Sequence, residues 1–204
     1  YNFLSLNLGY GVSQKITFEL ETGYYINKTQ VYNTTPEISL TGRGFSNFNL
    51  LLKYNFYADL SKRIYFLGAA GLKMPASRIY QSVDNVELPY QLQPSQGSYG
   101  LIVKSSFVKE NSLRGLRYFV TNRVEINGEN QYCYKPGSSV FTSLYVSKHL
   151  MVPWLKGDWT VILQLRNELR FKDVFKGETN QSTGSCLFFA VPQINYVLNE
   201  KWNI

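Results

Sequence analysis

The stretch WTVILQLRNELRFK, residues 159–172, decides the class of fold. Its apolar and polar side chains alternate along the chain. One face carries Trp159, Val161, Leu163, Leu165, Leu169 and Phe171, and the other carries Thr160, Gln164, Arg166, Glu168, Arg170 and Lys172. Successive side chains of a β-strand point to opposite faces, whereas a helix repeats every 3.6 residues. The stretch therefore predicts a long β-strand with one apolar and one polar face.

The same alternation recurs along most of the chain, and it predicts about 9–10 strands and no helix. The further predicted strands are residues 2–11, 16–27, 47–57, 64–75, 98–108, 116–127, 139–150 and 183–198, with the start of one more at 199–202. The residues between 28 and 45 and between 74 and 96 are expected to form long connections. Because long loops without a role are uncommon, the second connection is expected to be functional or ordered against the sheet.

Composition and charge exclude several classes of protein. No run of 18 apolar residues is present, which excludes a membrane-spanning helix. The formal net charge is +7, but the Lys and Arg residues are spread along the chain and form no basic cluster, so nucleic acid is not an expected partner. Cys133 and Cys186 form no metal-binding or CxxC spacing, and no metal or other cofactor is expected.

Strand length and connection length favour a membrane barrel over a soluble β-sandwich. Sandwich strands are typically shorter, whereas a tilted strand that crosses a bilayer needs about 9–11 residues. Outer-membrane barrels alternate short turns with long loops. Here short turns are expected near Ser13, Ser61, Ser112 and Glu200, an intermediate turn near Pro153, and long loops near Thr34, Val86, Gln131 and Gly177. The prediction is an all-β, antiparallel transmembrane β-barrel, with residues 1–204 forming a single domain.

A complete barrel needs an even number of strands with both termini on the periplasmic side. We therefore expect about 12 strands in the intact protein, with terminal strands lying outside this sequence. The residues predicted to line the interior are Glu19, Glu21, Lys53, Lys104, Arg123, Glu125, Gln164, Arg166, Glu168 and Arg170. Two interpretations stay open: these side chains line a selective conduit, or they form a ladder of ion pairs that fills a narrow barrel.

Catalysis is not expected. The one histidine, His149, falls in a turn at the predicted periplasmic end, away from the rim where barrel enzymes place their sites, and no GxSxG motif or paired-carboxylate spacing is present. Both cysteines fall near the predicted outer side, where a disulfide bond and chance placement are equally compatible with the sequence.

Three segments resemble a known family: YFLGAAGLKMP at residues 65–75, PSQGSYG at 94–100, and STGSCLFFAVPQINYVLNEKW at 182–202. They are similar to outer-membrane transporters for long-chain fatty acids and aromatic hydrocarbons, particularly the family linked to the meta-pathway of phenol degradation. The resemblance covers about a third of the chain. It implies passive uptake of a hydrophobic small molecule, often past an N-terminal plug.

The sequence thus leads us to expect a channel or transporter in the bacterial outer membrane for passive uptake of small solutes. The alternative is a structural or accessory barrel subunit of a larger envelope complex that transports nothing, and an embedded hydrolase ranks third. Expected partners are the lipid bilayer, lipopolysaccharide, a small-molecule solute and other outer-membrane proteins.

Overall fold

A computed structural model describes residues 1–32, 38–83, 86–150, 158–199 and 202–203. Among these residues the chain is all-β, and the long strands follow one another in sequence order. They are β1 (Asn2–Gly11), β2 (Ile16–Tyr32), β4 (Phe48–Asp59), β5 (Ile64–Met74), β8 (Gly100–Asn111), β9 (Leu116–Asn127), β11 (Ser139–Leu150), β12 (Asp158–Arg170) and β15 (Ser185–Asn199). No helix of the described part is long and apolar enough to cross a membrane.

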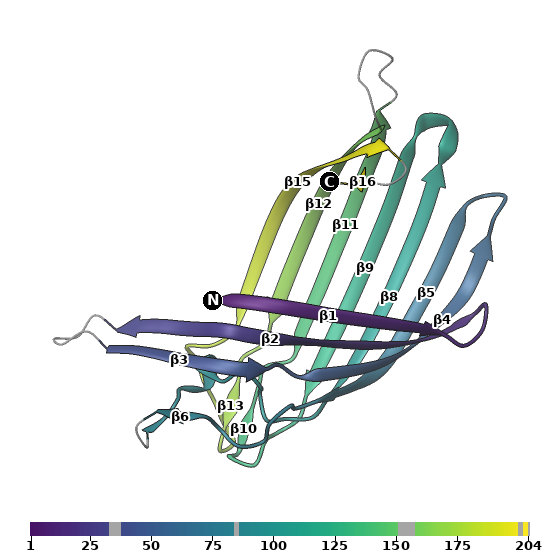
Figure 1. Cartoon of the computed structure of the whole chain (residues 1–204). Coiled ribbons are helices and arrows are strands. Elements are labelled where there is room, and N and C mark those ends of the chain that lie inside the picture. The colour runs from purple at the N-terminus through teal and green to yellow at the C-terminus, as the bar shows by residue number, and fades with distance from the viewer. Residues whose placement is uncertain (33–37, 84–85, 151–157, 200–201, 204) are drawn as a thin grey trace.

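The strands pair antiparallel in the order β1-β2-β4-β5-β8-β9-β11-β12-β15-β16, where β16 is Trp202–Asn203. The sheet curves into a half-barrel (Figure 1). Among the described residues, β1 and β16 lie at the two ends of this order and no ladder joins them. The predicted all-β, antiparallel sheet is confirmed, and closure into a barrel stays a prediction.

One predicted loop is a hairpin. Residues 28–45 were expected to be irregular, but β2 continues to Tyr32 and β3 (Ile38–Phe45) pairs with it. The hydroxyls of Thr29 and Thr41 form a hydrogen bond of 2.8 Å across this hairpin. The end of β2 has polar residues on both faces, and the alternation of Ile38 and Leu40 with Ser39 and Thr41 in β3 stops at Gly42, so the two-residue pattern is too short here to mark a strand. The predicted loop position Thr34 itself lies outside the described residues.

The connections alternate in length as predicted wherever the structure describes them. Short turns near Ser13, Ser61 and Ser112 close one end of the strands, and the turn at Ser112 is the 3-10 helix η2 (Ser112–Arg114). The long connections, around Val86, Gln131 and Gly177, lie together at the other end (Figure 1). The predicted turns at Pro153 and Glu200 lie outside the described residues.

The long connections contain short elements of their own, all at the same end of the half-barrel. These are β6 (Ser82–Val83), β7 (Val86–Glu87), the 3-10 helix η1 (Tyr90–Leu92), β10 (Tyr134–Lys135), β13 (Val174–Phe175) and β14 (Glu178–Thr179). Two small sheets result, β6-β7 and β10-β13-β14. The end that carries them is therefore ordered and partly covered, whereas the connections described at the opposite end, near Ser13, Ser61 and Ser112, are tight turns.

The two faces of the sheet differ sharply in chemistry. On β12, Leu163 and Leu165 are 44% and 46% exposed on one face, while Gln164 between them is only 7% exposed on the other. The polar face is the concave one. Glu21 on β2 contacts Arg123 on β9 at 2.7 Å, although these strands are four steps apart in the sheet, which is about 19 Å along a flat wall. Only a strongly curved sheet brings these side chains together across its hollow side.

Candidate functional site

The concave face carries a continuous network of charged side chains that spans β2, β4, β8 and β9. Lys53 pairs with Glu19 at 3.0 Å, and Lys104 pairs with Glu21 and lies 4.0 Å from Glu19. Arg123 contacts Glu21 at 2.7 Å and connects it to Glu125 on β9. Two carboxylates on one strand thus meet three cations that come from three other strands.

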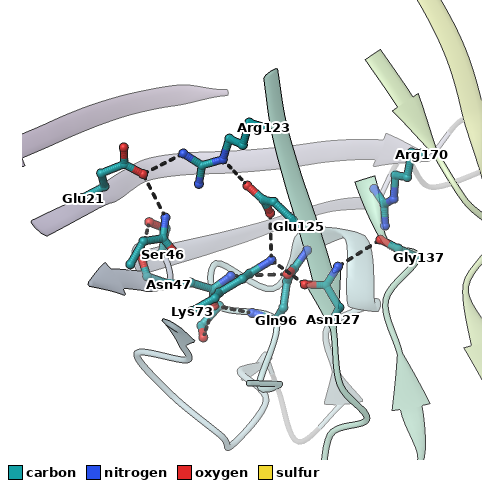
Figure 2. A network of polar contacts seen from close by, with 12 residues as sticks. Glu21, Ser46, Asn47, Lys73, Gln96, Arg123, Glu125, Asn127, Gly137 and Arg170 are labelled. Carbon is teal, nitrogen blue, oxygen red and sulfur yellow. Dashed lines mark hydrogen bonds and ion pairs between the residues drawn. The ribbon is translucent and has the colours of Figure 1, made fainter. Parts of the chain in front are cut away.

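The network continues along β9 toward the covered end of the half-barrel (Figure 2). Arg123 contacts Glu125 at 2.6 Å, and Glu125 contacts Lys73 on β5 at 3.3 Å. Lys73 is 5% exposed and also donates a hydrogen bond to Asn127 at 2.9 Å, and Asn127 in turn donates to the carbonyl of Gly137. Six of the predicted interior residues therefore belong to one network: Glu19, Glu21, Lys53, Lys104, Arg123 and Glu125.

Sequence reasoning missed Lys73 and Asn127. The segment GAAGLK of β5 has little side-chain bulk, so its two faces could not be distinguished. The pairing of β4 with β5 resolves this, because Lys53 is directly opposite Ala69 and the concave face of β5 therefore includes Ala69, Gly71 and Lys73. Lys73 lies four residues after Ala69 and therefore on the same face of the strand. The pairing of Ala69 with Lys53 would have identified this face as the interior one.

The four predicted interior residues of β12 lie on the same face but form separate groups. Gln164 donates hydrogen bonds to Ser143 and Tyr145 on β11 and accepts one from Gln193 on β15. Arg166 pairs with Glu168 at 2.8 Å. The Arg166 guanidinium also lies 4.8 Å from the ring centre of Phe189, which adds a cation–π contact. Arg170 lies nearest the covered end, where it pairs with Asp173 at 3.2 Å.

The connection between β5 and β8, residues 75–99, is called the strap below, and its described residues, 75–83 and 86–99, pack over the covered end of the concave side. Leu88, Leu92, Gln93, Ser95 and Ser98 are all buried in it. The strap is attached to the β2–β4 side of the half-barrel: the Nζ atom of Lys28 donates to the carbonyl of Gln93 at 3.0 Å, and the backbone N–H of Gln96 donates to Asn47 at 3.2 Å. This agrees with the expectation that the long connection is ordered against the sheet.

Asn130 joins the strap to the loop between β9 and β11. Its side-chain amide donates to the hydroxyl of Tyr80 at 2.5 Å and to the carbonyl of Gln96 at 3.3 Å. The ring of Tyr80 stacks on Tyr132, with centroids 4.1 Å apart, and Tyr90 packs against Tyr134 at 3.9 Å. The strap is thus held on both sides of the concave face.

Asp173 organises the remaining loops at this end. It is 2% exposed and accepts hydrogen bonds from the backbone N–H of Gly137, at 2.6 Å, and from the hydroxyl of Tyr134. Burial raises the pKa of the Tyr134 hydroxyl, and the Asp173 carboxylate beside it raises this pKa further. Burial likewise raises the pKa of Tyr90. Both phenols therefore stay neutral hydrogen-bonding groups at physiological pH.

Two hollows on the concave face adjoin the charged residues of this site. One, of about 280 Å³, is lined by Glu19, Lys53, Lys104, Arg123 and the wall of β5 around Leu67 to Ala69. The other, of about 300 Å³, lies beneath the strap, and its lining includes Lys73, Gln96, Glu125, Asn127 and Arg170. Both hollows present cations and carboxylates side by side. The arrangement can offer hydrogen bonds and charge to a polar or amphipathic solute.

The side chains that could support catalysis or redox chemistry, His149 and the two cysteines, lie apart from the ion-pair network of the concave face. His149 is near the short-turn end, with Nε2 4.0 Å from Asp158. Cys133 and Cys186 are both exposed and unpaired with one another. In the described part of the chain, no group of three His, Cys, Asp or Glu side chains is placed to hold a metal ion.

No protein-family model matches this chain, and no curated protein matches it. The resemblance to the fatty-acid and aromatic-hydrocarbon transporters therefore stays a prediction.

Proposed function

We propose that this chain forms the wall of a transmembrane β-barrel in the bacterial outer membrane and that small solutes pass along its concave face. One observation carries the proposal: the convex face presents its large apolar side chains outward, while ion pairs gather in the hollow. A soluble sheet would bury the apolar face and leave the charges in water. A barrel in lipid needs the opposite arrangement.

The dimensions of the strands agree with this location. The long strands have between 10 and 17 residues, enough to cross a hydrocarbon core at a tilt. In the sequence, aromatic residues fall near the ends of the predicted strands, where the girdles of a membrane barrel would lie. They are Tyr24, Tyr25, Tyr57, Tyr65, Trp154, Trp159, Phe171, Tyr196 and Trp202. Trp159 and Tyr196 pack at 4.4 Å near one end of β12 and β15, and Tyr24 packs on Phe45 at 5.1 Å. Trp154 and the side chain of Trp202 lie outside the described residues.

The solute we propose is small and passes without energy coupling. The concave face alternates positive and negative groups, and its β15 side adds Phe189 beside Arg166. Such a lining suits amphipathic molecules that have a polar or charged group next to an apolar body. This differs from the purely hydrophobic cargo that the family resemblance implies.

A second function is favoured by the density of the ion pairs and by the strap. If the pairs among Glu19, Glu21, Lys53, Lys104 and Arg123 fill the interior, the barrel conducts nothing and serves as a structural or accessory subunit of an envelope complex. The strap then closes one end permanently.

Single-channel recording separates the two functions. The full-length protein is inserted into planar lipid bilayers, and discrete conductance steps are expected. Because Lys104 and Arg123 lose a counter-charge in the Glu21→Gln variant, its steps should become more anion-selective, measured as a shift of reversal potential in a salt gradient. Protein that inserts in a folded form and gives no steps would contradict the channel and support the accessory role.

A further inference from the structure

Four uncharged polar side chains form one row across the convex face. They are Ser105 on β8, Asn122 on β9, Thr142 on β11 and Asn167 on β12. Each is the direct register partner of the next: Ser105 of Asn122, Asn122 of Thr142, and Thr142 of Asn167. Since Lys104 and Arg123 point into the concave network, their neighbours Ser105 and Asn122 point to the opposite face. We call these four residues the polar row.

The polar row lies inside the apolar band of the convex face. Two residues before and after each member, on the same face, the chain has an apolar side chain. These neighbours are Val103 and Phe107, Val120 and Val124, Val140 and Leu144, and Leu165 and Leu169. Polar residues are expected where strands leave the apolar band of a membrane barrel. The polar row has apolar neighbours on both sides, so this expectation does not explain it.

Hydrogen bonds inside the row use only part of its capacity. The Thr142 hydroxyl donates to the side-chain oxygen Oδ1 of Asn122 at 2.9 Å, and the Asn122 side-chain amide donates to the Ser105 hydroxyl at 3.4 Å. The Asn167 amide donates to the carbonyl of Leu187 at 3.3 Å and lies 3.7 Å from the sulfur of Cys186. An asparagine amide has two N–H donors and an oxygen that accepts twice. The row therefore still offers donors and acceptors at the convex surface, where hydrocarbon offers none.

We propose that the polar row is a contact site for a second copy of this chain in the plane of the membrane. A two-fold interface brings the same patch of both copies together, so the patch must complement itself. Ser, Thr and Asn all donate and accept, and the row has no charge that would repel its copy. The flanking Val, Leu and Phe side chains supply apolar packing around these hydrogen bonds. The inference rests on the proposed membrane location.

The test measures association in vesicles. The full-length protein carrying Cys186→Ser is labelled at the exposed Cys133 with a donor or an acceptor dye, and energy transfer is followed as the protein is diluted in phosphatidylcholine vesicles. The unsubstituted row is expected to give a concentration-dependent dimer. Asn122→Leu combined with Thr142→Val should weaken association about tenfold, the effect of losing a few hydrogen bonds between membrane segments.

The control is Leu52→Val, a conservative change on the convex face of β4 away from the row, which should leave association unchanged. Folding is checked by heat-modifiable gel mobility, and if the double variant does not fold, Asn167→Leu is measured in its place and should weaken the dimer about threefold. This inference alone is overturned if the folded, vesicle-bound protein stays monomeric. It is also overturned if a dimer forms and these substitutions do not change its association. Protein that does not float with the vesicles overturns the proposed function as well.

Discussion

Glu21 is the residue on which the concave network converges. It accepts from Lys104 and Arg123 and lies 3.4 Å from the amide nitrogen of Asn49. Removing its charge leaves two half-buried cations with fewer acceptors. We expect Glu21→Gln to lower the free energy of unfolding by about 1–3 kcal/mol, because an uncompensated buried charge is costly.

The measurement is urea unfolding of the protein refolded in lipid vesicles. Glu178→Gln, which changes an exposed carboxylate of β14 in the loop beyond β12, is the matched control and should be neutral. An Arg123→Gln change combined with Glu21→Gln should cost less than the sum of the two single changes, since the pair is removed together. Additive losses would show that the 2.7 Å contact carries no coupling.

At the scale of single residues, alternation in the sequence identified the faces on which charged side chains lie but not their partners. Glu19, Glu21, Lys104 and Arg123 were predicted to share the interior, and their side-chain contacts depend on a curvature that joins β2 to β9. Asp173 was not predicted at all. It follows the strand in a loop, and its burial arises from contacts with Tyr134 and Gly137, which lie far from it in the sequence.

At the scale of elements, β12 offers the sharpest test of what the convex face contacts. Leu163 points outward on this strand. In water, replacing an exposed leucine by arginine changes stability little, whereas in a bilayer it should cost about 2–4 kcal/mol near the middle of the membrane. We therefore expect Leu163→Arg to lower the free energy of unfolding measured in vesicles by this amount.

The control for this change is Leu113→Arg. Leu113 is fully exposed in the short turn η2 and should tolerate arginine without loss of stability. Equal stability of the two variants in vesicles would mean that Leu163 does not face hydrocarbon, which would contradict the proposed membrane location.

The elements themselves were predictable to different degrees. Strands with one apolar face, such as β1, β9 and β12, appear where alternation predicted them. Strand β3 was missed because its alternation is short: Ile38 and Leu40 alternate with Ser39 and Thr41, but Gly42 and Gly44 add no side chain to the apolar face. The small residues of β5 let it pack closely on its neighbour β4, since a Cβ atom at Gly71 would lie 1.9 Å from the carbonyl oxygen of Leu50.

At the scale of the whole molecule, the strap lies over part of the concave side, next to the hollow lined by Lys73 and Gln96. If solutes pass along this side, replacing residues 79–92 by a short Gly-Ser linker should increase single-channel conductance, because the segment buried around Leu88 and Leu92 is removed. The matched control is a glycine substitution of Leu60 and Lys62 in the tight turn at the opposite end, which should leave conductance unchanged. A strap deletion that inserts normally and conducts no better would place the constriction elsewhere.

The amino-acid sequence by itself determined that the chain forms long antiparallel strands, which side of most strands is apolar, and where the short and long connections fall, because these depend on side-chain order and turn chemistry within a few residues. Tertiary structure decided the rest. The charge network, the buried Lys73 and Asp173, and the strap held by Asn130 depend on strand register and on sheet curvature. Register and curvature arise from contacts between segments that are distant in the chain. The pattern of neighbouring residues therefore does not reveal them.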